Sequence, residues 1–236
     1  MSATVEIRQL DSLADQNLGR DVFDQTWAPD TGSEITPNLL QAMVHCGAYL
    51  SGAFIEGKCV GAALAFPAYT GELHLHSHMT AVLDTHRDQG VGAALKNNQW
   101  SWAAKNNYKK ITWTFDPLVA RNAKLNLIKL GVEISGYYPN FYGQMPDALN
   151  AGDESDRIMA TWQIAGDTPT QKVAISKTLE SDFLIAIPAD IVEIRKRDIA
   201  ENLIWRRQVR EQFMQAFAAG GRVVGFSVNN EYVVRI

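Results

Sequence analysis

The stretch LHLHSHMTAVLDTHRDQGVGAA, which runs from Leu73 to Ala94, decides the fold of this chain. Its first half alternates, and a period of two predicts a β-strand. After Asp84-Thr85, the glycine-bearing segment Arg87–Gly92 predicts the start of a helix. A strand that leads through a short loop into a helix presents free backbone N–H groups and the positive end of the helix dipole, which together suit an anion. The alternation places side chains on two faces: Leu73, Leu75, Ser77, Met79 and Ala81 on one, and His74, His76, His78 and Thr80 on the other.

The composition predicts a soluble globular protein. The 236 residues are 46% hydrophobic and 20% charged, which allows a sizeable core. A net charge of −4 argues against a nucleic-acid partner. No apolar run approaches the roughly 18–20 residues of a membrane span, and the N-terminus lacks the pattern of a secretory signal. Two cysteines, Cys46 and Cys59, have no metal-type spacing. We therefore expect a cytoplasmic protein, either monomer or homodimer.

Glycine, proline and aspartate divide the chain into strands and helices. The expected strands are Val5–Leu10, Ala48–Ile55, Lys58–Phe66, a strand from Leu73, Lys110–Phe115, Val132–Tyr138, Arg157–Ile164, Lys172–Ser176, Phe183–Ile187, Arg222–Val228 and Glu231–Ile236. The expected helices run from Asp11 or Ser12 to Trp27, over Pro37–His45, from the glycine loop to about Asn106, over Ala120–Leu130 and over Asp198–Ala219. The long loop Pro139–Ser155 is of a length that is commonly functional. A boundary at Gly166–Thr170 predicts two domains, residues 1–165 and a βαββ extension, residues 166–236, that packs on the first.

The glycine segment carries the motif R-x-x-G-x-G at Arg87, Gly90 and Gly92. Its position between a strand and a helix resembles the GNAT superfamily of N-acetyltransferases, over roughly Val5–Ile164. The segments WTFDP, RNA, NLIKLG, YG and DR-x4-W resemble more narrowly a poorly characterised bacterial-type GNAT subfamily with a C-terminal extension. The resemblance implies an α/β GNAT fold, in which helices flank a mixed, splayed central sheet. A Rossmann site is disfavoured because the motif is one glycine short and does not open a βαβ unit.

The resemblance also implies acetyl-CoA, or another acyl-CoA, as co-substrate, and no metal. The glycines let the main chain approach the diphosphate of coenzyme A, while the end of the preceding strand pairs with the pantetheine arm. The residues expected to bind the cofactor are Ala81, Val82, Leu83, Arg87, Asp88, Gln89, Gly90, Val91, Gly92 and Ala93, with further amide contacts from Asn122 and Asn126.

Two positions depart from the family pattern. Ala120 stands where many members carry a cofactor-contacting Asn, and Leu127 where many carry the tyrosine that protonates the leaving thiolate. A thiol of pKa about 8.5 leaves tolerably well as its anion, so an acid is helpful rather than obligatory. Tyr137, Tyr138 and Tyr142 are possible substitutes, and we take Tyr142 as a candidate catalytic residue.

Four of the five histidines lie between His74 and His86. An amine that attacks a thioester must lose a proton, and histidine is the usual base near neutral pH. The arylalkylamine acetyltransferases of this superfamily carry an H-x-H at the distance of His76 and His78 from the glycine loop, which favours His78, then His76, as the catalytic base. Two alternatives stay open: zinc binding by His74, His76 and His78, or a structural role of His76, His78 or both in hydrogen bonding to the neighbouring backbone.

Two arginines interrupt the apolar stripe of the last helix. Arg206 and Arg210 fall among apolar residues, and isolated buried charges are too costly to remain unpaired. Either they form ion pairs with an acid such as Asp156 or Asp190, or they bind a substrate carboxylate. The stripe itself consists of Ile199, Leu203, Val209, Phe213 and Phe217.

The sequence therefore predicts an N-acyltransferase that moves a short acyl group from coenzyme A to a primary amine by direct attack. An N-succinyltransferase acting on amino acids is one alternative, and a non-catalytic acyl-CoA-binding module is another. A metal-dependent hydrolase is a third. For an acyltransferase we expect a small-molecule amine or amino acid as the partner. We expect neither a nucleic acid nor a membrane as a partner.

Overall fold

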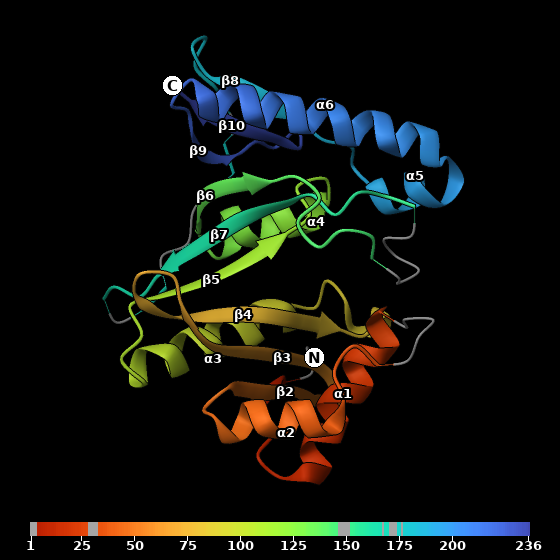
Figure 1. The fold of residues 1–236 in the computed structure, drawn as a ribbon, viewed down its shortest axis with the longest axis vertical. Helices are drawn as coiled ribbons and strands as arrows, with labels where there is room; N and C mark the ends of the chain where they lie inside the picture. Colours follow the sequence, from red (N-terminus) through yellow and green to blue (C-terminus); the bar gives the residue numbers. More distant parts are fainter. Residues whose placement is uncertain (1–3, 28–32, 146–151, 167, 170–173, 176) are drawn as a thin grey trace. The chain divides into compact units, whose positions relative to one another are not determined.

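The computed structural model of the chain describes residues 4–27, 33–145, 152–166, 168–169, 174–175 and 177–236. The chain forms two compact units (Figure 1). The first combines Met1–Trp113 with Gln163–Pro169, and the second combines Thr114–Trp162 with Thr170–Ile236.

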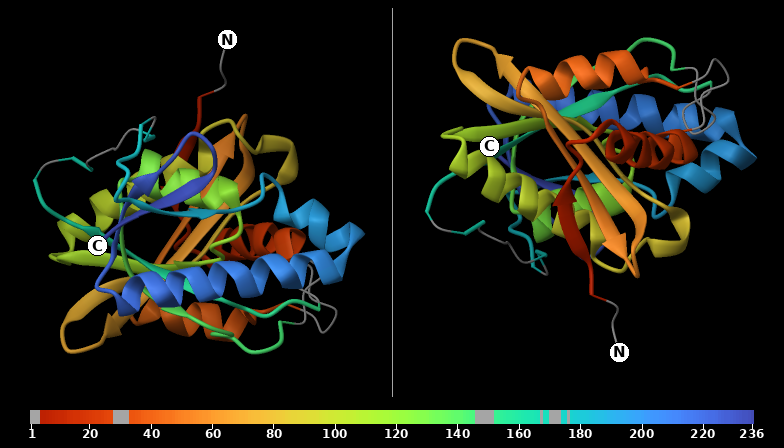
Figure 2. Two further views of the ribbon diagram at one scale, coloured as in Figure 1. Left: turned by 90° about the horizontal axis from the view of Figure 1, so that it is seen from above. Right: turned by 90° about the horizontal axis from the view of Figure 1, so that it is seen from below.

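A mostly antiparallel sheet forms the centre of the first unit. Figure 2 shows its long β3 and β4 strands as neighbouring ribbons. Between β2 and β3, Glu56 (φ 50°) and Gly57 (φ 77°) form the tight turn expected there. The strands follow in the order β1 (Glu6–Gln9), β2 (Tyr49–Ile55), β3 (Lys58–Tyr69), β4 (Leu73–Val82) and β5 (Lys110–Phe115). The first four pair antiparallel, and β5 pairs parallel to β4.

Helices cover both faces of this sheet. In α1 (Leu13–Trp27), a Cβ on Gly19 would lie 3.8 Å from that of Ala62 in β3. A Cβ on the neighbouring Gly61 would instead lie 3.1 Å from Val91 of α3 (Val91–Lys105). Because adjacent residues of a strand face opposite ways, α1 and α3 pack on opposite faces. The remaining helix, α2 (Pro37–His45), begins where predicted: Thr36 Oγ1 accepts the Leu39 N–H.

A β-bulge interrupts β4 at His78. Leu64 of β3 pairs with Met79 and Ala65 pairs with Ser77, so His78 is an extra residue in the ladder. Ser77 contacts Lys96 of α3, whereas Met79 packs on the opposite face, in the cluster that contains residues of α1 and α2. The prediction that Met79 and Ala81 share a face with Ser77 is therefore wrong, because the bulge moves every later side chain to the other face.

The second unit contains the end of β5, two short helices and two antiparallel strands. The helix expected over Ala120–Leu130 is α4 (Ala120–Ala123) followed by the π-helical segment η2 (Lys124–Lys129). Gly131, with φ 65°, ends it as predicted. The strands β6 (Glu133–Tyr138) and β7 (Arg157–Gln163) pair beyond it.

The C-terminal extension completes the second unit with a three-stranded sheet and two helices. Its strands β8 (Phe183–Ala186), β9 (Arg222–Phe226) and β10 (Glu231–Arg235) lie in the order β8-β10-β9. The predicted long helix is α6 (Ile199–Ala218), whose N-cap Asp198 accepts two backbone N–H groups. The sequence analysis missed α5 (Ile191–Arg197). Ring stacking of Phe213 on Tyr137, with centroids 5.2 Å apart, joins α6 to β6.

The predicted fold class is confirmed: the structure is mixed α/β, with a mostly antiparallel sheet, flanking helices and an additional C-terminal sheet. The strand expected over Lys172–Ser176 lies largely outside the described residues, and Ile175 forms an isolated bridge with Ser227. The division at residues 165 and 166 stays a prediction, and the structure adds that Thr114–Trp162 pack with the extension. Within the part of the chain that the structure describes, no helix has the length and apolarity needed to cross a bilayer.

Candidate functional site

The second half of β4 has one unpaired edge. Over the described residues of β4 and β5, the ladder joins Leu75 to Ile111 and His76 to Thr112 and extends no further. On its other edge β4 stays paired with β3 up to Val82. The main chain from Ser77 to Val82 therefore has N–H and C=O groups free of β5, and such groups can pair with an extended ligand.

His76 and His78 lie side by side at the start of this free edge. Their ring centroids are 6.5 Å apart, and both rings pack against Phe66, at 5.4 and 5.7 Å. His76 Nδ1 is 3.1 Å from Thr112 Oγ1. His78 is exposed and makes no side-chain hydrogen bond with any residue that the structure describes. The bulge thus presents an imidazole whose ring nitrogens are available to a substrate.

Burial favours the neutral form of both imidazoles. Burial, with smaller contributions from His78, His74 and Lys96, lowers the pKa of His76 to about 4. The contact of His78 with Phe66 partly buries the ring, and this burial lowers the pKa of His78 below its ordinary value. A neutral imidazole can accept a proton, which is the state that a general base requires.

The N-terminus of α3 is open toward solvent. Gly90 is its N-cap in the left-handed conformation, φ 82°, and no side chain caps the helix. The first intrahelical bond is from the Ala94 N–H to the Gly90 oxygen, at 3.0 Å. The N–H groups of the residues before Ala94 are therefore the orphan donors that an α-helix leaves at its start, and they suit a phosphate. Arg87 forms an ion pair with Asp84 beside this loop.

The three same-face histidines proposed as a zinc site do not form one. His74 is buried and its Nδ1 lies 3.0 Å from the Glu72 carbonyl oxygen, while His76 contacts Thr112. Among the residues described, no group of three or more His, Cys, Asp or Glu side chains could hold a metal ion. The hydrogen bond to the Glu72 carbonyl oxygen gives His74 a structural role.

Several predicted site residues belong to the second unit. Asn126 and Leu127 are buried in the π-helical segment, and Asn122 is half-buried in α4. Tyr142 is exposed, and its hydroxyl lies 3.0 Å from Thr114 Oγ1. Tyr137 is unsuited to protonate a thiolate, because it is buried and its hydroxyl donates to Asp156 at 2.5 Å. The roles of Asn122, Asn126 and Tyr142 remain predictions.

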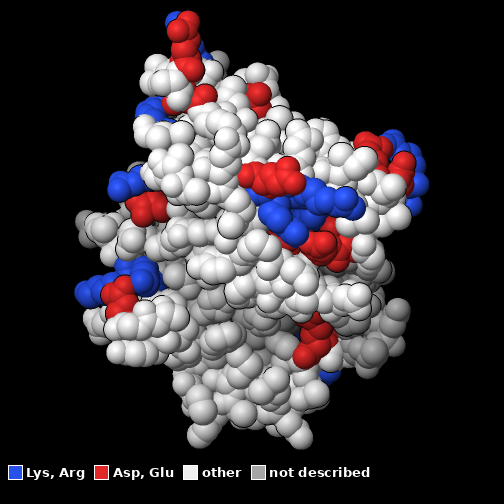
Figure 3. Space-filling view, turned by 45° about the horizontal axis from the view of Figure 1, so that its top comes forward, with Lys and Arg blue, Asp and Glu red and all other residues white. Residues whose placement is uncertain are grey.

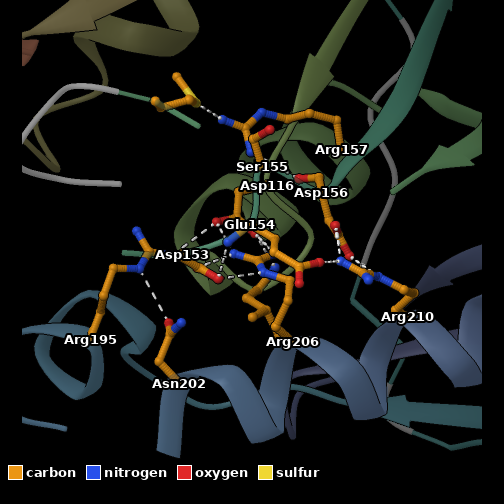
Figure 4. Close-up of polar contacts among 12 residues, drawn as sticks. Asp116, Asp153, Glu154, Ser155, Asp156, Arg157, Arg195, Asn202, Arg206 and Arg210 are labelled. Atoms are coloured by element: carbon orange, nitrogen blue, oxygen red, sulfur yellow. Dashed lines mark hydrogen bonds and ion pairs between the residues drawn. The ribbon is translucent and has the colours of Figure 1, made fainter. Parts of the chain in front are cut away.

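Arg206 is at the centre of a buried ion-pair network (Figure 4). It donates to Asp116 at 2.7 and 2.9 Å and to Asp153 at 2.6 and 3.2 Å. Arg195 joins both carboxylates, at 3.2 Å from Asp116 and 2.8 Å from Asp153, and also contacts Asn202. Burial alone would raise the pKa of Asp116, but the Arg206 guanidinium outweighs it and holds that pKa well below its usual range.

Arg210 is paired in a second, more exposed group. It donates to Asp156 through Nε at 2.8 Å and also pairs with Glu154. On the face drawn in Figure 3, basic and acidic side chains lie beside one another, as in such surface pairs. The expected ion pair with Asp156 is thus found for Arg210, whereas the one suggested with Asp190 is not, because Asp190 caps α5. A substrate-binding role for Arg206 or Arg210 stays a prediction, and the observed pairing favours the structural alternative.

The sequence analysis missed the carboxylates that Arg206 binds and a buried lysine, Lys96. Asp116 was interpreted only as the end of a strand, and Asp153 as part of a polar loop. The one available signal was the need to pair buried charges. Two arginines on an apolar helix face require acidic partners elsewhere in the chain. Lys96 gave a similar signal, since it follows Leu95 on the face of α3 that packs against the sheet.

Comparison with known families places residues 16–131 in the acetyltransferase (GNAT) family. Searched against curated proteins, the sequence finds no match. The strand β4, the bulge and the glycine loop lie within these matched residues.

Solved structures of N-acetyltransferases and GNAT-family acetyltransferases share the fold. A GNAT-family acetyltransferase from Streptococcus pneumoniae superposes with a TM-score of 0.56 at 15% identity, over 69% of this chain and 100% of that one. The ribosomal-protein-S18-alanine N-acetyltransferase from Escherichia coli gives 0.55 at 14% identity, over 70% and 96%. A GNAT-family acetyltransferase from Elizabethkingia anophelis, solved with acetyl-CoA bound, gives 0.51 at 18% identity, over 69% and 98%.

Proposed function

We propose that this protein is an acyl-CoA-dependent N-acyltransferase that transfers an acetyl or other short acyl group to a primary amine in the cytoplasm. The observation that carries the proposal is the continuous sequence of features along β4 and α3. A neutral, exposed imidazole at His78 is followed by a free strand edge to Val82 and then by the uncapped helix N-terminus at Gly90. A base, a binding edge for an extended arm and a diphosphate cradle thus occur in that order.

The chain's own residues fit coenzyme A in this arrangement. The residues from Gln89 to Ala93 offer backbone donors for the diphosphate, and Ala81 and Val82 offer main-chain groups for the pantetheine arm. The N–H of Leu83, also expected at this arm, already donates to the Val60 oxygen. Bound acyl-CoA supplies an activated thioester. A backbone N–H of the free β4 edge polarises its carbonyl oxygen, and His78 takes the proton of the attacking amine, with His76 beside it.

Transfer is direct in this proposal. The bond from the amine nitrogen to the acyl carbon forms as the bond from that carbon to sulfur breaks, and the thiolate leaves with the electron pair. Tyr142 is the candidate for protonating the thiolate, since its exposed hydroxyl is bonded only to Thr114 among the described residues. Buried Leu127 cannot do so, because it has no proton to give.

A thiol-release assay tests the proposal. Amines and amino acids are offered with acetyl-CoA and with succinyl-CoA, and free coenzyme A is measured. Release that depends on the amine supports the proposal, and the preferred thioester distinguishes acetyl from succinyl transfer. Saturable coenzyme A binding without release from any amine would instead support the non-catalytic binding module.

A further inference from the structure

The described part of the first unit contains one buried lysine, Lys96 of α3, and the mechanism above does not use it. Its ammonium group donates to Ser77 Oγ at 2.7 Å and to Gln99 Oε1 at 3.5 Å. The same nitrogen lies 3.7 Å from the centroid of the Trp113 ring. No carboxylate is among these contacts. Burial of an ammonium group without an ion-pair partner destabilises the folded protein. The buried position of Lys96 therefore indicates a role other than stability.

The position of Lys96 indicates this role. The last paired residues of β4 and β5 are His76 and Thr112, and the next residue along each strand is Ser77 and Trp113. Lys96 contacts both of these residues. Its side chain therefore fills the point at which the two strands part, and it binds β4 at the residue directly before the His78 bulge.

We propose that Lys96 is a positioning residue of the acyl-transfer site, which holds Ser77 in place and thereby fixes the bulge that orients His78. This inference rests on the proposed function, because orienting His78 matters only if His78 acts on a substrate. A β-bulge is a local disruption of the ladder, and a charge-assisted hydrogen bond to the preceding residue stabilises one geometry of it.

Electrostatics support the same assignment. The charged or titratable groups that act on His76 are His78 and His74 of its own strand and Lys96 of α3. The positive charge of Lys96 is one of the causes that lower the pKa of His76. Burial in turn lowers the pKa of Lys96 itself to about 7, while the Ser77 and Gln99 oxygens and the Trp113 ring face its ammonium form.

Lys96→Met tests the inference in the full-length protein, with Lys105→Met of the same helix as the matched control, since Lys105 is exposed. Met retains the length of the apolar stem, so we expect Lys96→Met to fold with an unchanged or higher Tm. We expect kcat to fall about ten- to hundredfold, because a small displacement of a catalytic group lowers the rate by such a factor. The KM for the acyl-CoA should change little. Ser77→Ala should act in the same direction, and the double variant should be no worse than Lys96→Met alone.

Histidine NMR titration supplies a readout independent of activity. In Lys96→Met the pKa of His76 should rise slightly, because burial, the main cause of its lowered pKa, is retained and only the smaller effect of the Lys96 charge is lost. The His78 ring resonances should shift, while Lys105→Met leaves both histidines as in the wild type. Unchanged histidine titrations and an unchanged kcat in Lys96→Met would overturn the inference. If Lys96→Met fails to fold, Ser77→Ala decides by the same two measurements. If the wild type transfers no acyl group, the proposed function fails, and the NMR comparison still decides whether Lys96 sets the state of the histidines.

Discussion

At the scale of single residues, two polar side chains of this protein differ in exposure and in hydrogen bonding. His78 is exposed at a bulge without a hydrogen-bond partner among the described residues, whereas Arg206 is buried and binds two carboxylates. An available polar group can act on a ligand, but a saturated one cannot without losing its partners. This contrast separates the residue expected to affect rate from the one expected to affect stability.

Substitution of His78 should remove the general base. We expect His78→Gln to lower kcat about a hundredfold or more, with the thermal unfolding curve unchanged because the residue is exposed. Steady-state acyl transfer measures the effect, and His45→Gln at an exposed position of α2 is the control. Loss of less than twofold in kcat would show that another group or solvent takes the proton.

The pH profile should report the same histidine. The pKa of His78 lies below the ordinary 6.5, so the imidazole is neutral at pH 7 and becomes protonated only as the pH falls through the lowered pKa. We therefore expect kcat/KM to decline on the acidic side with a midpoint below pH 6.5, and this limb to disappear in His78→Gln. A midpoint above pH 6.5 would contradict the assigned burial effect.

Substitution of Arg206 should destabilise the second unit. In Arg206→Met the buried carboxylates of Asp116 and Asp153 would keep Arg195 as their common ion-pair partner. Breaking a buried ion pair lowers the free energy of unfolding by about 3–5 kcal/mol. Chemical denaturation followed by circular dichroism measures the loss, with Arg207→Met, at the neighbouring exposed position, as the control. A variant of wild-type stability with a raised KM for an acidic substrate would instead favour the carboxylate-binding role.

At the scale of elements, the start of α3 combines a glycine in the left-handed conformation with uncapped backbone donors. The left-handed conformation of Gly90, φ 82°, turns the chain so that the first N–H groups of the helix point out of the loop. A residue with a side chain is less stable in this conformation by about 1–2 kcal/mol. The helix start of such a variant would therefore relax toward a different geometry. The element, and not one side chain, is what would bind the diphosphate.

Replacement of this glycine should therefore weaken cofactor binding specifically. We expect Gly90→Ala to raise the Kd for coenzyme A about tenfold or more, as measured by isothermal titration calorimetry. Gly71→Ala is the matched control, since Gly71 has φ 88° and equally open surroundings but lies in the turn between β3 and β4. Equal losses of affinity in both variants would show a general effect of strain.

At the scale of the whole molecule, the extension is an integral part of one compact unit. The carboxylates of Asp116, Asp153 and Asp156 come from the segment Thr114–Trp162, and their guanidinium partners come from α5 and α6 of the extension. Tyr137 likewise packs on Phe213 of α6. Three buried acids would lose their arginine partners if the extension were absent.

A chain that ends at Ala165 should therefore not form a stable protein. We expect this truncated form to be aggregated or to lack a cooperative unfolding transition, since each broken buried pair costs about 3–5 kcal/mol. Expression, size-exclusion chromatography and thermal unfolding measure the outcome against the full chain. A monodisperse 1–165 chain with a cooperative transition would show that the ion-pair network is dispensable.

Local signals in the sequence determined the elements and the position of the proposed anion site. The alternation of β4, the Pro and Gly boundaries of α2, and the Arg87–Gly92 motif are properties of neighbouring residues, so the strand, helix and cradle could be read from the order of the chain. The histidine pair was visible for the same reason.

Only the tertiary structure decided the bulge, the ion pairs and the buried lysine. The extra residue at His78 is defined by its pairing with β3, and the partners of Arg206 lie 90 and 53 positions away in the chain. Lys96 is one more charged helix residue until its contacts with Ser77 and Trp113 are known. Strand register and the pairing of buried charges depend on contacts between distant segments, and local periodicity carries no information about them.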